Sequence, residues 1–159
     1  MNRNKYLVIF IVLSMVLVGC TKNHMTSIYN NNEEISSDTN SFNLDIVEQS
    51  IDGQEFKGVI NKIEGMDTIW TYESDEDIEL DMTYLLTVIS GKLKLVLISP
   101  DNSVTTLIET NNKSDVVDFA TNTLQIKKGI NRIKMVAGKN TSLEFNINIP
   151  NGEFEELGM

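Results

Sequence analysis

Apolar and polar residues alternate with a period of two along most of the chain, and this pattern limits the fold more than any other feature. Every second residue of segment 78–88 is apolar, and the residues between them are mostly polar. Segment 143–149 repeats the pattern. Because successive side chains of a β-strand point to opposite faces, both segments predict half-buried strands. No stretch carries an apolar stripe of helical period and length, so we expect an all-β fold.

Turn-forming residues separate the expected strands. Ser90-Gly91 predicts a two-residue hairpin turn, and Pro100-Asp101-Asn102 predicts a further turn. Gly138-Lys139-Asn140 also predicts a turn, whereas Lys128-Gly129 predicts a bulge within a strand. With about seven to nine short strands joined in this way, residues 42–159 are predicted to form one antiparallel β-sandwich, either immunoglobulin-like or jelly-roll.

The N-terminal segment has the pattern of an export signal. Arg3 and Lys5 precede an almost unbroken apolar run, residues 6–18, which is shorter than the roughly 20 residues that a membrane-spanning helix needs. The run closes with Leu17-Val18-Gly19-Cys20, and Cys20 is the only cysteine of the chain. This ending resembles the lipobox of bacterial lipoproteins.

The resemblance to lipoproteins implies that a diacylglyceryl group is transferred to the Cys20 thiol and that the chain is cleaved between Gly19 and Cys20. Residues 1–19 would then be a signal peptide, and membrane lipid would hold the protein at the cell membrane, facing outside the cytoplasm. Two acyl chains give stable attachment, whereas one chain binds only marginally. The alternative is an ordinary secretory signal or an uncleaved helix in which Cys20 is incidental.

Residues 20–41 are rich in Asn, Ser and Thr and contain few apolar side chains. Such a segment buries too little surface to offset its ordering entropy, so we expect a flexible, disordered tether. His24, the only histidine, lies in this segment as a solvated linker residue or a lone metal ligand. The predicted sandwich therefore contains neither His nor Cys, which excludes Ser-His-Asp and Cys-His catalysis and ordinary zinc sites within it.

The chain is acidic, with a formal net charge of −10. Loss of the predicted signal peptide would remove Arg3 and Lys5 and make the mature chain more acidic still. This balance argues against nucleic acid as a partner, because phosphate binding needs clustered cations. It also argues against a broad electrostatic attachment to anionic lipid headgroups.

Carboxylates crowd the segment 73–81, which contains no cation. Calcium is the natural ion to neutralise such a turn, since it takes six to eight oxygen ligands. Asp75, Asp77 and Glu79 are the candidate ligands, although the segment lacks the glycine and spacing of an EF-hand loop. The alternative is an acidic turn that is simply solvated, and no other cofactor is indicated.

Trp70 and Tyr72 share one face of a predicted strand, residues 68–73. If exposed, the two rings would be candidate ligand contacts, as a stacking platform for sugar rings or an anchor for a protein. The alternative is that Trp70, the only tryptophan, fills the core of the sandwich.

The outer faces of the expected strands carry two further signals. Val96 and Ile98 make the end of one strand apolar on both faces, so we expect that end to be covered on both sides. Cations occupy outward positions of two strand pairs, where they would dock a partner or block edge-to-edge pairing of strands. These cations are Lys92, Lys94, Lys127, Lys128, Arg132 and Lys134.

Together these features favour a membrane-anchored, non-catalytic binding module for an envelope protein or a wall glycan. One alternative is a glycan-active enzyme that uses a pair of carboxylates, although nothing in the sequence singles out two of them. Another is an accessory lipoprotein of a transporter or sensor.

Overall fold

The computed structural model describes residues 24–113 and 118–159, and over these ranges the chain folds as an antiparallel β-sandwich. Two short helices, α2 (His24–Ile28) and α3 (Asn32–Ile35), precede the strands. The eight strands in the described ranges are β1 (Ser41–Asp52), β2 (Glu55–Ser74), β3 (Ile78–Ser90), β4 (Lys92–Ile98), β5 (Val104–Asn111), β6 (Ala120–Ile126), β7 (Gly129–Asn148) and β8 (Glu153–Phe154). All strand pairs are antiparallel, which confirms the predicted fold class.

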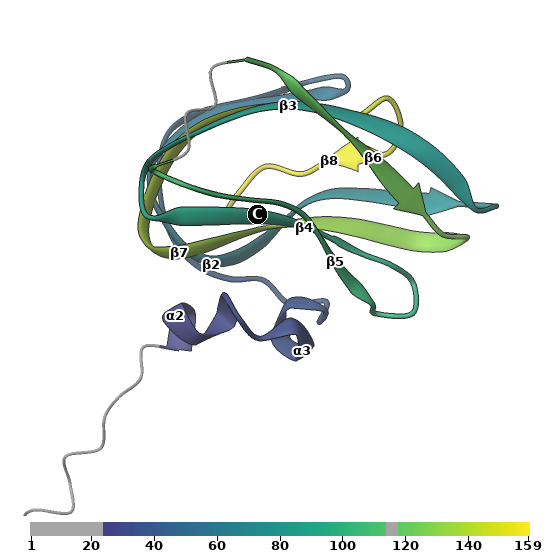
Figure 1. Cartoon of the computed structure of the whole chain (residues 1–159), viewed down its shortest axis with the longest axis horizontal. Coiled ribbons are helices and arrows are strands. Elements are labelled where there is room, and N and C mark those ends of the chain that lie inside the picture. Colours follow the sequence, from purple (N-terminus) through teal and green to yellow (C-terminus); the bar gives the residue numbers. More distant parts are fainter. Residues whose placement is uncertain (1–23, 114–117) are drawn as a thin grey trace, which may run out of the picture.

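The strands β2 and β7 are each 20 residues long and run through both layers of the sandwich. In the upper sheet of Figure 1, the start of β2 pairs with the end of β7, flanked by β1 on one side and by β3 and β6 on the other. In the lower sheet, the end of β2 pairs with the start of β7, flanked by β8 on one side and by β4 and β5 on the other. The sandwich is therefore one sheet folded over a corner that β2 and β7 share.

This corner lies at residues 60–65 of β2 and 137–143 of β7, where the register between the two strands shifts. Thr141 is fully buried there, and its hydroxyl oxygen lies 2.9 Å from the carbonyl oxygens of Lys92 and Gly138. The same hydroxyl accepts a hydrogen bond from the Lys92 amide at 3.2 Å. Because one hydroxyl serves backbone groups of two strands, Thr141 fastens the start of β4 to the bend in β7.

Two of the predicted turns belong to this corner, so both predictions are wrong. Ser90-Gly91 does not close a hairpin, since β3 pairs with the end of β7 in the upper sheet and β4 pairs with its start in the lower sheet. Gly138-Lys139-Asn140 lies within β7, which continues to Asn148. Gly91 (φ 78°) and Asn140 (φ 52°) supply positive φ values, which a sharp bend between sheets requires as much as a hairpin turn does.

The other two predicted turns have different outcomes. Pro100-Asp101-Asn102 does join β4 to β5 as an antiparallel hairpin, with Asn102 at φ 63°. Lys128-Gly129 does not form a bulge within one strand. Instead β6 ends at Ile126 in the upper sheet, and β7 begins at Gly129 in the lower sheet.

The main core lies between the two sheets. The aromatic ring of Phe56 packs edge-on against Phe145, with ring centroids 4.9 Å apart. Trp70 is fully buried among aliphatic side chains of both sheets, and its indole Nε1 donates a hydrogen bond to the carbonyl oxygen of Asn151 at 2.8 Å. Gly152 lies directly against the indole, where a Cβ would come within 2.6 Å of the ring. The core is thus closed at this end by the segment that leads into β8.

Residues 24–40, which include both helices, pack beneath the lower sheet (Figure 1) and are called the N-terminal clamp. Ile28, Tyr29 and Ile35 of the clamp are buried. They contact apolar residues on the outer face of the lower sheet, namely Met66, Val96, Ile98 and Val136. The predicted flexible tether is therefore wrong for residues 24–40, whereas the expectation that Val96 and Ile98 are covered on both sides is confirmed.

Two cations of β7 hold the clamp by its backbone carbonyls. The Lys134 ammonium is fully buried and donates to the carbonyl oxygens of Ser37 (2.8 Å) and Thr39 (2.7 Å). Arg132 donates to the carbonyl oxygen of Ser36 at 3.0 Å and pairs with Asp38. Both side chains point outward from the sandwich as expected, yet the clamp covers them, so they offer no free docking surface.

No helix in the described part of the chain is long and apolar enough to cross a membrane.

Candidate functional site

Two rows of side chains cross four strands on the outer face of the upper sheet. In the first row, neighbours in the register are Glu48, Val59, Glu144 and Thr87. In the second row they are Ser50, Lys57, Asn146 and Leu85. All eight side chains are exposed or half-buried, while the residues between them along each strand are mostly buried. The alternation of side chains along each strand, which directs every second residue into the core, thus also places these eight side chains next to one another on the surface.

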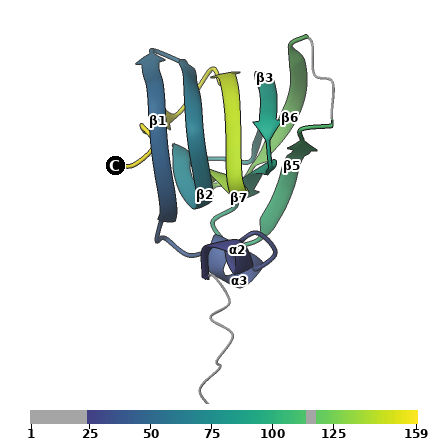
Figure 2. The ribbon, with the colours of Figure 1, turned by 90° about the vertical axis from the view of Figure 1, so that its left-hand side faces the viewer.

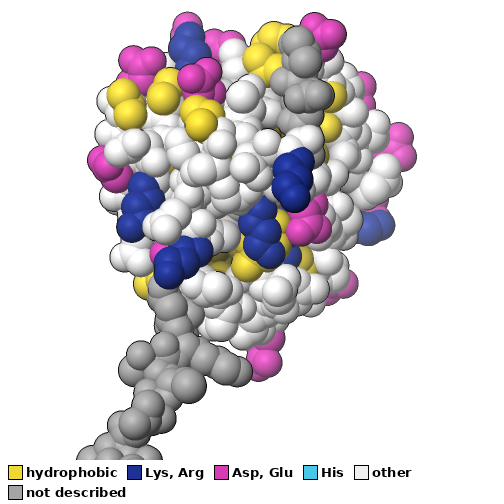
Figure 3. All heavy atoms as spheres, turned by 60° about the vertical axis from the view of Figure 1, so that its left-hand side comes forward, with side chains coloured by type: hydrophobic (Ala, Val, Ile, Leu, Met, Phe, Trp, Pro, Cys, Tyr) yellow, Lys and Arg dark blue, Asp and Glu magenta, His cyan; other side chains and the backbone are white. Residues whose placement is uncertain are grey.

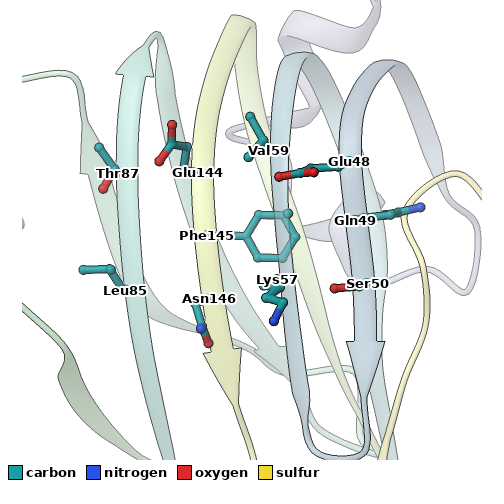
Figure 4. A pocket seen from close by; sticks show the side chains of 11 residues that line it. Glu48, Gln49, Ser50, Lys57, Val59, Leu85, Thr87, Glu144, Phe145 and Asn146 are labelled. Atoms are coloured by element: carbon teal, nitrogen blue, oxygen red, sulfur yellow. The ribbon is translucent and has the colours of Figure 1, made fainter.

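The two rows line a depression of about 390 Å³ (Figure 4). Its volume falls within the range of small-molecule sites, which is roughly 300–1,000 Å³. Gly58 and Phe145, which are buried residues between the two rows, also line it. The depression is the natural candidate for a ligand site on this face.

A network of charge and hydrogen bonds holds one side of the depression. The Asn146 amide donates to a carboxylate oxygen of Glu55 at 2.8 Å, and the Lys57 ammonium lies 3.5 Å from the other oxygen. The hydrogen bond from Asn146, with the charge of Lys57, lowers the pKa of Glu55. Glu55 therefore stays ionised, and it holds Asn146 and Lys57 in place within the second row.

An exposed aromatic ring adjoins the same row. Phe119 is 62% exposed and directly precedes β6, in which Ala120 pairs with Tyr84 of β3. Phe119 therefore lies one residue beyond the last residue pair between β6 and β3, and Tyr84 of that pair precedes Leu85, the end of the second row. The row thus runs from polar groups at Ser50 and Lys57 to the apolar Leu85, with the exposed Phe119 following in the segment that leads into β6.

The structure places the predicted aromatic contacts elsewhere. Trp70 is fully buried, so its prediction as a ligand contact is wrong and the alternative, a core residue, is confirmed. Tyr72 is half-buried beside it, with ring centroids 5.9 Å apart, and packs against the core rather than lining the depression. Sequence alternation alone could not say which face of β2 lies inward at this point, because the register shifts between Thr68 and Trp70.

The acidic segment 73–81 does not gather its carboxylates. Asp77 accepts hydrogen bonds from the Lys127 ammonium (2.9 Å) and the Lys128 amide (2.8 Å), and these lower its pKa, with the Lys128 amide as the larger cause. Glu79 lies across from Gln125 on β6 and accepts from its amide at 2.9 Å. In residues 24–113 and 118–159, no three acidic, His or Cys side chains are arranged to hold a metal ion. The arrangement gives no support to calcium binding at Asp75, Asp77 and Glu79.

The lipobox, Leu17-Val18-Gly19-Cys20, lies outside the described residues, so the predicted lipidation of Cys20 stays a prediction. Sequence reasoning did not single out the residues of the depression. The alternation of segment 143–149 does mark Glu144 and Asn146 as outward residues. Only the pairing of β7 with β2 and β3 shows which side chains lie next to these two on the surface.

Comparison with known proteins shows little similarity. No family model and no curated protein sequence matches the chain. Among solved structures, two mutants of family 29 carbohydrate-binding modules align with 70% of this chain and 92% of theirs, at 11% sequence identity and a TM-score of 0.36.

Proposed function

We propose that this protein is a membrane-anchored, extracytoplasmic binding module without catalytic activity, and that its ligand is a glycan of the cell envelope. The observation that carries the proposal is the second row, in which hydroxyl, ammonium, amide and apolar groups follow one another across the upper sheet from Ser50 to Leu85. Glycans present the same mixture, with hydroxyl groups around the edge of each ring and C–H groups on its faces.

Each end of this row suits one part of a sugar. Lys57 and Asn146 donate hydrogen bonds, and neighbouring Glu144 accepts them, which matches the two roles of a hydroxyl group. Phe119 and Leu85 offer apolar surface beside these polar groups, and an aromatic face binds the C–H face of a ring. A sugar lying along the row would satisfy both kinds of contact at once.

The same geometry disfavours hydrolysis. Glu48 and Glu144 lie on β1 and β7, with Val59 of β2 between them. Figure 4 shows the Glu48 carboxylate over β2 and the Glu144 carboxylate turned toward β3, so the two do not face one another across the depression. A glycosidase needs an acid and a base, or an acid and a nucleophile, on opposite sides of one bond. Binding without cleavage is the function that this arrangement supports.

The anchor of this module would be Cys20, as its lipobox implies. Mass spectrometry of the chain purified from membranes tests this part of the proposal: the N-terminal peptide should begin at Cys20 and carry the acyl groups. A Cys20→Ser chain is the control and should leave the membrane fraction. An unmodified Cys20 in the membrane-bound chain would refute lipid anchoring.

Glycan binding is tested by the depletion of soluble wall polysaccharide fragments on immobilised protein. Lys57→Ala, Asn146→Ala and Phe119→Ala should each weaken binding by roughly tenfold, since each removes about one hydrogen bond or one ring contact. Matched controls on other surfaces are Lys128→Ala, Asn112→Ala and Ile130→Ala, which should bind as the unaltered chain does. Equal binding by both sets would refute the site, and no binding by the unaltered chain would refute a glycan ligand.

A further inference from the structure

The N-terminal clamp leaves little chain between the predicted lipid and the folded domain. α2 begins at His24, four peptide steps after Cys20. Four extended residues span at most about 14 Å, so an acylated Cys20 would hold the start of α2 close to the bilayer surface. A flexible tether would have let the domain turn freely, but a packed clamp does not.

The clamp meets the sandwich at the corner of β2 and β7. The Thr26 hydroxyl donates to the Glu64 carboxylate at 2.9 Å, and Glu64 lies within the bend of β2. The Tyr29 ring lies beneath Lys92, whose ammonium is 3.7 Å from the ring centroid. The Tyr29 hydroxyl also donates to Glu109 of β5 at 2.9 Å. These contacts fix which face of the domain would turn toward a membrane that holds Cys20.

That face carries exposed lysines although the chain as a whole is acidic. Lys62 and Lys139 lie in the bends of β2 and β7, and Lys92 lies across Gly138 beside them. We call Lys62, Lys92 and Lys139 the corner lysines. Several of the blue Lys and Arg side chains in Figure 3 lie in the lower half of this face. Carboxylates also lie near this face: Asp45 accepts from Asn61 (2.7 Å), Glu109 accepts from Tyr29, and Glu33 and Glu34 lie on α3 of the clamp.

We propose that the corner lysines rest on the anionic headgroups of the membrane that anchors Cys20, and so hold the domain in one orientation. The inference rests on the proposed lipidation, because an acidic chain needs the anchor to approach an anionic surface. Local attraction then acts over a distance comparable to the screening length of about 8 Å at physiological salt. The depression lies on the outer face of the upper sheet, on the other side of the sandwich from the clamp, and would stay open to solvent.

Lysine footprinting of the full-length, lipidated chain tests this orientation without any substitution. The chain is reconstituted in vesicles of phosphatidylcholine with phosphatidylglycerol and treated with a water-soluble acetylating reagent, and each lysine is quantified by mass spectrometry. Labelling of the corner lysines should fall about fivefold relative to the detergent-solubilised chain. Lys57, Lys127 and Lys128 are the internal controls and should not change, since they lie on the upper sheet or the β6–β7 turn.

Equal labelling of the two sets of lysines in these vesicles would overturn the orientation. Equal protection in vesicles of phosphatidylcholine alone would overturn the role of anionic headgroups. A chain that carries no acyl group would remove the anchor and this inference with it. Glycan binding is measured separately on the same vesicles, so its loss or survival does not alter the footprint.

Discussion

The Lys134 ammonium donates a hydrogen bond to the carbonyl oxygen of Ser37 at 2.8 Å, across a sequence separation of 97 residues. The same ammonium also donates a hydrogen bond to the carbonyl oxygen of Thr39, two residues further along the chain. A buried charge costs free energy unless it is well bonded, and here the backbone of the clamp supplies the bonds. Burial still lowers the pKa of Lys134 to about 8, with the positive charge of Arg132 adding to the effect. The clamp is thus held by the Lys134 ammonium, and the burial of this charge would be unfavourable without the carbonyl groups of the clamp.

Lys134→Met should loosen the clamp. Methionine fills similar volume but donates no hydrogen bond, so two carbonyl oxygens lose their partner. We expect the free energy of unfolding to fall by about 1.5–3 kcal/mol, the usual range for hydrogen bonds to charged groups. Amide hydrogen exchange over residues 24–40 should accelerate more than exchange in the core strands. Lys128→Met, on an exposed lysine, is the control, and a clamp that exchanges no faster in Lys134→Met would contradict the role of Lys134.

The clamp also shows where sequence reasoning failed. Residues 20–41 contain few apolar side chains, and on composition alone they cannot form a core of their own. Residues 24–40 of this segment fold because an existing sheet offers them an apolar surface at Met66, Val96 and Val136. The outward apolar residues Val96 and Ile98 did signal that something covers them, but a sequence pattern does not name the covering segment.

The strands were more predictable than their connections. Alternation identified β3 and the second half of β7, because each of these faces the core mainly on one side, and it also found β4, whose second face is covered by the clamp. It did not show that β7 is one strand through both sheets. The bend at Gly138 to Asn140 uses the same residue types as a turn, and only the long-range pairing with β2 distinguishes the two. The depression depends on the same pairing, so its residues could not be grouped from sequence.

Thr141→Val should destabilise the corner. Valine keeps the shape of threonine but removes the hydroxyl, so the Lys92 amide loses its acceptor and the carbonyl oxygens of Lys92 and Gly138 lose a donor. A buried donor without a partner costs about 1–3 kcal/mol. Urea unfolding measures the loss, with Thr87→Val, on the exposed face of β3, as the matched control. If both variants unfold at the same urea concentration, Thr141 does not fasten the corner.

Trp70→Phe should lower stability and leave glycan affinity unchanged. The smaller ring leaves space against Gly152 and loses the hydrogen bond to Asn151, which together should cost about 1–4 kcal/mol. Because Trp70 is the only tryptophan, its fluorescence reports on this site alone, and addition of a bound glycan should not change it. A glycan-induced shift of the emission, together with weaker glycan binding by Trp70→Phe, would show that Trp70 does contact the ligand. Phe119→Ala is the opposite control, expected to lose affinity and keep the stability of the unaltered chain.

Asp67→Asn should change how stability depends on pH. Asp67 is fully buried, and burial raises its pKa from 3.8 to about 6, although the Gly158 amide (2.7 Å) and Lys134 partly oppose this shift. Between these two pKa values the folded chain keeps a proton that the unfolded chain releases, so stability falls as the pH rises through this window. The loss attributable to Asp67 should approach about 3 kcal/mol by pH 7. In Asp67→Asn this dependence of stability on pH should disappear, and the variant should gain stability relative to the unaltered chain between pH 4 and pH 6.

The midpoints of urea unfolding, determined at several pH values between 4 and 6, measure this change. Asp52→Asn, on the surface, controls for the loss of one carboxylate. Parallel pH profiles of Asp67→Asn and the unaltered chain would show that Asp67 is ionised without cost, and hence that solvent reaches it.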